Sequence, residues 1–408
     1  MKLKLLLATS LFCASIAYGQ QSGQNYVLSR TMLNSAGTDY VDNVQYYDGL
    51  GRPMQSLSKA VQASTVKERL ATLQEYDNMG RVGNSWLPTP VTANYTEAAS
   101  LKNLATAASG YGDTHPYGKN VYEASPLERL TSQYGAGAAW HNNSKAVNTA
   151  YLLNQASGNL SCKRYYISNN TLAGGGSSDV YAAGRLHVTQ TTDEDGKVSY
   201  TFTDLLGNTV LVRQVNGSEL LDTYYVYDNY NNLRYVLQPM YQSEANLAKY
   251  AFQYEYDYRN RCVKKTLPGA DYISYVYDDA DLLIYSQDGN QRAVSTTASA
   301  QKWTYYKYDS MHRLTEQGEC TGQSNTTNAV VDIKNYYDSY SFIGSTGFTN
   351  SNYTAGNSYG KGYLTGSEVT VLGSSSKIYK AFYYDQKGRE VKRVQNNLLS
   401  GYDVTSTT

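Results

Sequence analysis

The stretch YKYDSMHRL, residues 306–314, contains the pattern that decides the fold. The residues before Asp309 alternate as in a β-strand. Asp309 then starts a turn, and His312, three residues later, is one of the few residue types that tolerate left-handed backbone. A type I turn followed by one left-handed residue has this spacing. The stretch therefore predicts a β-hairpin corner with a positive φ at His312.

The pattern occurs eight times, which indicates an internal repeat with loops of variable length. In each copy a Gly, Asn, Asp or His stands three residues after an Asp, and Arg follows it in five copies. We expect that Arg to begin the return strand and to stack on a neighbouring Tyr or pair with an Asp. The Asp residues are Asp48, Asp77, Asp204, Asp228, Asp257, Asp278, Asp309 and Asp385.

The composition supports an extended β surface. The chain contains 43 Tyr but only 6 Phe and 3 Trp. Tyr suits strands on which the ring is packed while the hydroxyl reaches water or a partner. Lys and Arg total 35, as do Asp and Glu, so the balance argues against a dedicated nucleic-acid binder.

The N-terminus predicts export. Residues 1–19 combine a Lys-containing start, an apolar stretch and small residues at Ala17 and Gly19, which is typical of a cleavable signal peptide. No later segment is apolar enough for a transmembrane span. We therefore expect a secreted protein, located in the periplasm, at the outer cell surface or outside the cell.

The repeat unit resembles the YD repeat of the RHS (rearrangement hotspot) family over residues 200–391. Residues 26–140 resemble the N-terminal domain that precedes these repeats in secreted RHS proteins of diderm bacteria. The shared motifs are YYDGLGRPMQ (46–55), WLP (86–88), THPYG (114–118), YEASPLERL (122–130) and GAGAAWH (135–141). The resemblance implies a β-ribbon that spirals into a hollow shell, which in the family often encloses a C-terminal toxin or anchors at a cell surface.

We therefore predict a mainly β fold, in which antiparallel hairpin repeats form a curved ribbon or partial shell and the N-terminal domain carries a few short helices. The expected divisions are the signal peptide (1–19), the RHS-associated N-terminal domain (20–160) and a YD-repeat ribbon (161–408), with a loop-rich, degenerate part at 321–376. Helical signals occur at 96–109, at 243–249, and at Ser125–Glu128, which matches a capping box.

Candidate sites all have structural explanations. Asp309, Ser310 and His312 are the residue types of a hydrolytic triad, but a triad brings together residues that are distant in sequence, and these three share one turn. His115, His141 and His187 have no partner at zinc-ligand spacing. Residues 193–196, DEDG, favour a hairpin turn over a calcium loop. We therefore assign no catalytic, cofactor-binding or metal residue and predict a non-enzymatic protein.

Three cysteines remain after the signal: Cys162, Cys262 and Cys320. One disulfide with one remaining thiol is compatible with this number, and so are three buried thiols. The wide spacing gives no metal-binding motif.

Three hypotheses for function follow. The protein is a shell or surface scaffold, the N-terminal part of a polymorphic toxin with a C-terminal toxin or downstream polypeptide as partner, or a carbohydrate-binding adhesin whose Tyr-rich strands contact a cell-surface glycan or a neighbouring cell. No Pro follows an Asp, so the family's Asp-Pro self-cleavage site cannot be carried over. Residues 401–408 alternate like the start of a strand, so we expect a truncated ribbon whose final edge is unpaired.

Overall fold

The computed structural model describes residues 23–34, 36–323, 329–354 and 358–406, so the predicted signal peptide lies outside the described residues. The fold is mainly antiparallel β with a few short helices, as predicted. The chain forms two compact units. The first comprises the described parts of 1–162 and 180–221, and the second comprises those of 163–179 and 222–408.

The first unit is a series of strands in which each pairs antiparallel with its neighbour. Strand β6 adds a short pairing to β4. The elements are β1 (Asn25–Met32), β2 (Tyr40–Tyr47), β3 (Pro53–Gln62), β4 (Thr65–Tyr76), β5 (Val82–Trp86), β6 (Thr89–Pro90), α2 (Ala98–Thr106), β7 (Tyr117–Tyr122), β8 (Leu130–Tyr134), α3 (Ala138–Asn142), β9 (Ala146–Leu153), the 3-10 turn Gly158–Leu160, β12 (His187–Thr192), β13 (Val198–Thr203) and β14 (Thr209–Asn216).

The second unit continues the same antiparallel pattern from β16 to β27, and a separate hairpin is formed by β10 and β11. Strand β15 (Glu219–Tyr227) spans the boundary between the units. The other elements are β10 (Tyr165–Ser168), β11 (Thr171–Gly174), β16 (Leu233–Leu237), the 3-10 turn Pro239–Gln242, α4 (Leu247–Tyr250), β17 (Ala251–Tyr256), β18 (Cys262–Thr266), β19 (Tyr272–Tyr277), β20 (Leu283–Gln287), α5 (Gly289–Ala293), the 3-10 turn Ala298–Ala300, β21 (Lys302–Tyr308), β22 (Leu314–Thr321), β23 (Val330–Tyr337), β24 (Leu364–Thr370), β25 (Lys377–Tyr384), β26 (Glu390–Asn396) and β27 (Tyr402–Ser406).

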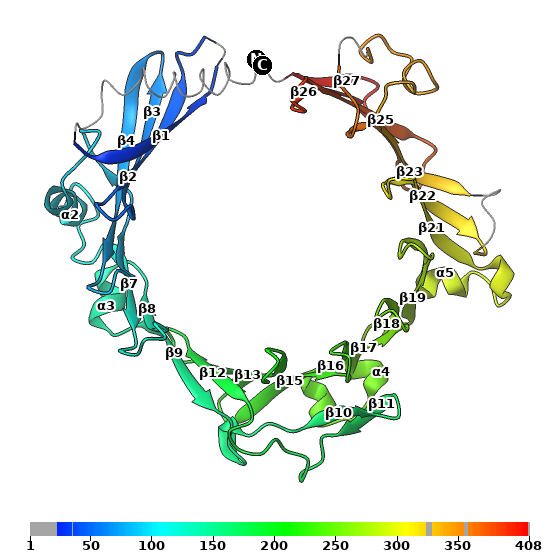
Figure 1. The fold of residues 1–408 in the computed structure, drawn as a ribbon, viewed down its shortest axis with the longest axis horizontal. Helices are drawn as coiled ribbons and strands as arrows, with labels where there is room; N and C mark the ends of the chain where they lie inside the picture. Colours follow the sequence, from blue (N-terminus) through cyan, green and yellow to red (C-terminus); the bar gives the residue numbers. More distant parts are fainter. Residues whose placement is uncertain (1–22, 35, 324–328, 355–357, 407–408) are drawn as a thin grey trace. The chain divides into compact units, whose positions relative to one another are not determined.

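The core of the first unit lies between one face of β1–β5 and helix α2, which lies against these strands in Figure 1. Leu101 and Ala105 of α2 are fully buried there. Burial raises the pKa of Tyr46 to about 12. Its hydroxyl donates to the carbonyl oxygen of Asn94 (2.9 Å), which fixes the segment leading to α2. The helix predicted over 96–109 is thus present, and its amphipathic face explains its position.

The loop-rich interpretation of 321–376 is correct only in part. Residues 338–363 contain no helix or strand within the part that the structure describes, but β23 and β24 on either side form a regular antiparallel pair. The loop also carries its own apolar anchors. Phe342, Phe348 and Tyr353 are buried in a core cluster against Ala381 and Tyr383 of β25. The sequence analysis did not identify these aromatic anchors, because the segment is rich in Ser and Gly and was interpreted as a loop from its composition.

The helix predicted from the capping box at Ser125–Glu128 is absent. The Ser125 hydroxyl accepts from the Leu127 N–H, but Glu128 adopts a φ of 53° and donates its N–H to the Ser125 carbonyl oxygen. The segment is the turn between β7 and β8, closed by a bidentate Glu123–Arg129 ion pair. Because β7 and β8 pair antiparallel, the short segment between them must reverse the direction of the chain. This requirement overrides the local helix signal.

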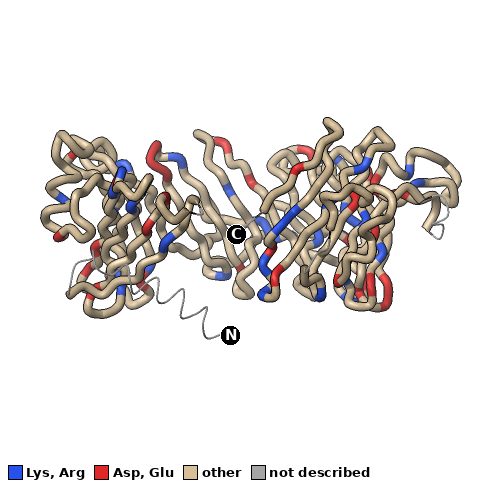
Figure 2. Tube along the Cα trace, turned by 90° about the horizontal axis from the view of Figure 1, so that it is seen from above, with Lys and Arg blue, Asp and Glu red and all other residues tan. Residues whose placement is uncertain are grey.

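The helical signal at 243–249 is realised as the shorter helix α4, capped by the Asn246 side chain. Residues 402–406 form strand β27, as their alternation predicts, and pair with β26. Among the described residues, no helix is long and apolar enough to cross a membrane. Figure 2 shows acidic and basic residues interspersed along the chain trace.

Candidate functional site: linked hairpin corners and a polar cleft

The predicted corner at Asp309 is present in full. The Asp309 Oδ1 atom accepts from the backbone N–H groups of Met311 (2.9 Å) and Arg313 (3.0 Å), and Oδ2 accepts from Arg313 Nε (2.7 Å). His312 has a φ of 61° and donates its N–H to the Asp309 carbonyl oxygen. A register shift separates Lys307 from Tyr308, as expected for a hairpin with a bulge beside the turn.

All eight predicted corners have this geometry, with positive φ at the fourth residue and two backbone N–H groups on the Asp side chain. Asp193 forms the same corner, which confirms the turn interpretation of DEDG. Asn397 forms another, with Ser400 at a φ of 63°. The repeat pattern was defined by an Asp at its first position, so it did not include Asn397.

At five places a Tyr that stands directly before an Asp links its hairpin to the preceding corner. Its hydroxyl donates to the carbonyl oxygen of the residue five positions after the preceding Asp, at the start of the return strand. The bonds are Tyr76 to Pro53 (2.7 Å), Tyr256 to Leu233 (2.9 Å), Tyr277 to Cys262 (3.0 Å), Tyr308 to Leu283 (3.0 Å) and Tyr337 to Leu314 (3.0 Å). We call this repeated arrangement the corner ladder.

The corner Arg reinforces the ladder, as predicted. In three corners the Arg guanidinium lies over the ring of the next ladder Tyr while it remains paired with its own Asp. The distances from the guanidinium carbon to the ring centroid are 4.3 Å for Arg52 and Tyr76, 4.9 Å for Arg261 and Tyr277, and 4.4 Å for Arg313 and Tyr337. Each Asp–Arg–Tyr set therefore joins two consecutive hairpins.

The Asp309 carboxylate is held ionised. Hydrogen bonding from the Arg313 backbone lowers the pKa of Asp309, and the Arg313 side chain adds to this effect. With its oxygens engaged in this way, Asp309 makes no side-chain hydrogen bond to Ser310 or His312 within the described part of the chain. The three residues are close together because they share a turn.

The histidines differ from the sequence expectation in one respect. His115 and His141 stack with ring centroids 4.6 Å apart, although 26 residues separate them. Asp113 holds both segments, because it accepts from the backbone N–H groups of His115 (2.6 Å) and Ala138 (2.8 Å). His187 lies on β12, apart from this pair in the strand order. No group of three or more His, Cys, Asp or Glu side chains that could hold a metal occurs among the described residues.

Cys162, Cys262 and Cys320 are thiols in this structure. Cys162 and Cys320 are buried, whereas Cys262 is half-buried. Burial raises the pKa of Cys262 and of Cys320. A raised pKa keeps a thiol protonated, which makes it a poor nucleophile.

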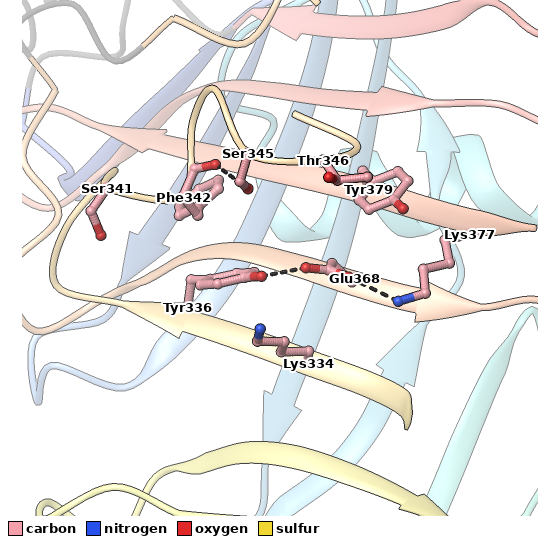
Figure 3. Close-up of a pocket in the computed structure, with 9 residues that line it drawn as sticks. All are labelled: Lys334, Tyr336, Ser341, Phe342, Ser345, Thr346, Glu368, Lys377 and Tyr379. Atoms are coloured by element: carbon pink, nitrogen blue, oxygen red, sulfur yellow. Dashed lines mark hydrogen bonds and ion pairs between the residues drawn. The ribbon is translucent and has the colours of Figure 1, made fainter. Parts of the chain in front are cut away.

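A cleft of about 490 Å³ lies in the second unit, where the loop after β23 crosses the sheet. Strand β23 contributes Lys334 and Tyr336, β24 contributes Glu368, and β25 contributes Lys377 and Tyr379. Figure 3 shows these side chains on three neighbouring strands beneath the loop. The sequence analysis did not identify this site, because its residues come from a segment interpreted as degenerate.

The loop supplies the opposite wall of the cleft through Ser341, Phe342, Ser345 and Thr346. Phe342 stacks on Tyr336 with ring centroids 4.7 Å apart. Burial and a hydrogen bond to Glu368 raise the pKa of Tyr336, so this phenol stays neutral and acts as a donor.

The chain was compared with known protein families, curated proteins and solved structures. Residues 21–153 match a family described as a domain of unknown function, DUF6443. No curated protein matches the chain. The TcdB2–TccC3 crystal structure is similar with a TM-score of 0.52 at 11% identity, over 94% of this chain and 20% of that one. The TcdB2–TccC3–Cdc42 structure gives 0.53 at 11% identity, over 98% and 20%.

The Photorhabdus luminescens Tc holotoxin pore structure is also similar, with a TM-score of 0.52 at 12% identity over 94% of this chain and 19% of that one. At these identities the likeness concerns the fold alone. The chain spans about a fifth of the length of the chains that it matches.

Proposed function

We propose that this chain is a non-enzymatic RHS-type scaffold that builds part of the wall of a secreted or cell-surface assembly. The observation that carries the proposal is the corner ladder, in which a tyrosine hydrogen bond joins each linked corner to the next and an Arg–Tyr contact reinforces three of the five links. Links between nearest neighbours let a wall of any length keep the same local stability. A scaffold needs this property, and no reactive centre is required for it.

The corner tips give a second argument. Five of the eight predicted corners carry a large, mainly apolar side chain two residues after the Asp, and each is more than two-thirds exposed: Leu50, Met79, Leu206, Tyr230 and Met311. Apolar side chains at regular positions along a repeat are expected where further polypeptide covers them. Their exposure supports a role as one part of a larger assembly.

We further propose that the assembly belongs to a polymorphic toxin system, with a downstream polypeptide as its partner. The fold likeness to the TcdB2–TccC3 structures supports this assignment. The test is to express the complete gene product and digest it with a non-specific protease. A resistant fragment that is lost in the Tyr277→Phe/Tyr308→Phe double variant would support enclosure. Equal digestion of the partner in both proteins would contradict it.

Export is tested by fractionating the native host and sequencing the N-terminus of the mature chain. We expect the chain outside the cytoplasm, with Gln20 as its first residue. A cytoplasmic chain that retains residues 1–19 would refute this part of the proposal.

The alternative function is a carbohydrate-binding adhesin that uses the Tyr-rich strands. The ladder tyrosines give it no support, because their hydroxyls are bonded to the backbone and arginines lie over several of the rings. A glycan array on the mature chain tests the adhesin alternative, and a hydrolase substrate screen tests the non-enzymatic assignment. Glycan binding lost on Tyr→Ala changes would restore the adhesin, and turnover abolished by one Asp or Glu change would overturn the non-enzymatic assignment.

A further inference from the structure

The cleft beneath the 338–363 loop is built from a row of aligned side chains. Lys334 on β23 stands opposite Glu368 on β24, which stands opposite Tyr379 on β25. Facing residues in neighbouring strands place their side chains on the same side of a sheet. The row therefore presents a cation, a carboxylate and a phenol to one small volume.

The Glu368 carboxylate is fixed but not saturated. One oxygen accepts from the Tyr336 hydroxyl and the other from Lys377 Nζ (3.1 Å). A carboxylate has about four acceptor positions, so two remain for donors from a ligand. Both partners of Glu368 line the same cleft, as Figure 3 shows.

Lys334 provides a cation that is not neutralised by Glu368. Its Nζ lies 5.2 Å from the centroid of the Tyr336 ring and forms no ion pair among the described residues. Glu316, its neighbour on β22, is already engaged by Lys307 (2.7 Å) and by the Tyr305 hydroxyl (2.8 Å). With Lys377 paired to Glu368, the cleft has one positive charge in excess.

The loop wall adds hydroxyl groups and is held in place. Ser345 donates to the Phe342 carbonyl oxygen (2.6 Å), and the Thr346 hydroxyl has no partner within the described residues. Gly347, at a φ of 90°, lies so close to Tyr379 that an added Cβ would be 2.1 Å from the ring. This contact seats the loop on the sheet, so the cleft exists before a ligand arrives.

We propose that this cleft binds a sugar acid, a monosaccharide-sized uronate unit, whose carboxylate pairs with Lys334. Its ring hydroxyls donate to Glu368 and exchange hydrogen bonds with Ser345 and Thr346. The volume of about 490 Å³ is in the range of small-molecule sites. One excess positive charge matches a monoanion, whereas a dianionic phosphate would be repelled by Glu368. This binding is independent of the scaffold function proposed above.

The experiment is calorimetric titration of the mature chain with galacturonic acid and its trisaccharide, beside galactose and galactose 6-phosphate. We expect the two acids to bind and neutral galactose to bind at least about tenfold more weakly, the loss expected for one charge-assisted contact. The Lys334→Gln variant should lose a similar factor toward the acids. Lys265→Gln is the matched control, because Lys265 also lies over a single tyrosine ring but outside the cleft.

Thermal unfolding of each variant shows whether it is folded. A folded Lys334→Gln protein that binds the acids like the unchanged chain would overturn the proposal. Equal binding of galactose and galacturonic acid, tighter binding of the sugar phosphate, or failure of both acids to bind would overturn it as well. None of these outcomes affects the protease test of the scaffold.

Discussion

At the scale of single residues, the informative position is the fourth of each corner. Its backbone is left-handed in every predicted copy, whether the residue is Gly, Asn, Asp or His. The sequence could predict this because a left-handed φ excludes most residue types. The exclusion is a local steric effect, so no tertiary information was needed to assign His312.

This position gives the first prediction, made for His312. His312→Gly should change the free energy of unfolding by less than about 1 kcal/mol, since relief of the left-handed strain offsets the greater freedom of the unfolded chain. His312→Val should destabilise by roughly 1–3 kcal/mol, because a β-branched residue is strained at φ 61°. Urea denaturation of both variants measures the difference. A valine variant as stable as the glycine variant would contradict the turn assignment.

The first corner position gives a second prediction. Asp309→Asn should retain the turn, because Asn397 already accepts two backbone N–H groups at the same position of its own corner. It should lose only the pairing with Arg313. Asp309→Ala loses both, so thermal unfolding should rank the unchanged chain above Asn and Asn above Ala. Equal melting temperatures for Asn and Ala would show that the backbone contacts contribute little.

At the scale of the element, the hairpins were predictable and their connections only partly so. Arg–Tyr stacking was expected, whereas the hydrogen bond from the Tyr hydroxyl to the previous corner depends on which strands are neighbours. The turn at Ser125–Glu128 and the aromatic anchors of the 338–363 loop were missed for a related reason. Strand pairing and burial decide those segments, and a single local motif contains neither.

The ladder hydrogen bond gives the third prediction. Tyr277→Phe removes only the hydroxyl that donates to the Cys262 carbonyl oxygen, so it should cost about 1 kcal/mol. Tyr275→Phe, on the same strand, is the control, because its hydroxyl makes no hydrogen bond among the described residues and its loss should be nearly neutral. Chemical denaturation compares the two. Equal losses would indicate that the ladder bond is not a specific link.

At the scale of the whole molecule, the composition predicted the character of the sheet correctly. Strand β19, which carries Tyr272, Tyr275 and Tyr277, is half-buried along its whole length, as expected of a tyrosine-rich strand that keeps its hydroxyls near water or a partner. The polar cleft could not be predicted in the same way. Its side chains come from three strands and a loop, and only the strand register brings Lys334 opposite Glu368.

The last prediction is a stability profile that falls at both ends of the pH range. Side-chain pairing with Arg129 lowers the pKa of Glu123 to about 2, and pairing with Arg313 lowers that of Asp338 to about 2. A carboxylate whose pKa is lowered in the folded chain stabilises the fold. This contribution is complete above the pKa of the unfolded chain, about 4, and is lost as the pH falls through about 2. Burial raises the pKa of Tyr46 and of Tyr256 to about 12. That contribution is complete below about 10 and is lost as the pH rises through about 12.

Urea midpoints measured across the pH range, together with phenolate absorbance, test both limbs. Glu123→Gln should flatten the acid limb and leave the alkaline limb unchanged, because it removes one shifted carboxylate and no phenol. Tyr256→Phe should flatten the alkaline limb and leave the acid limb unchanged, because it removes one shifted phenol and no carboxylate. Stability that stays constant from about pH 4 to about pH 2 would mean that the carboxylate pairs are already broken in the folded chain. The two limbs depend on different groups. The acid limb reports the carboxylate–arginine pairs at the strand ends, and the alkaline limb reports the buried tyrosine rings. One pH profile therefore measures the stability contributions of the corners and of the sheet separately.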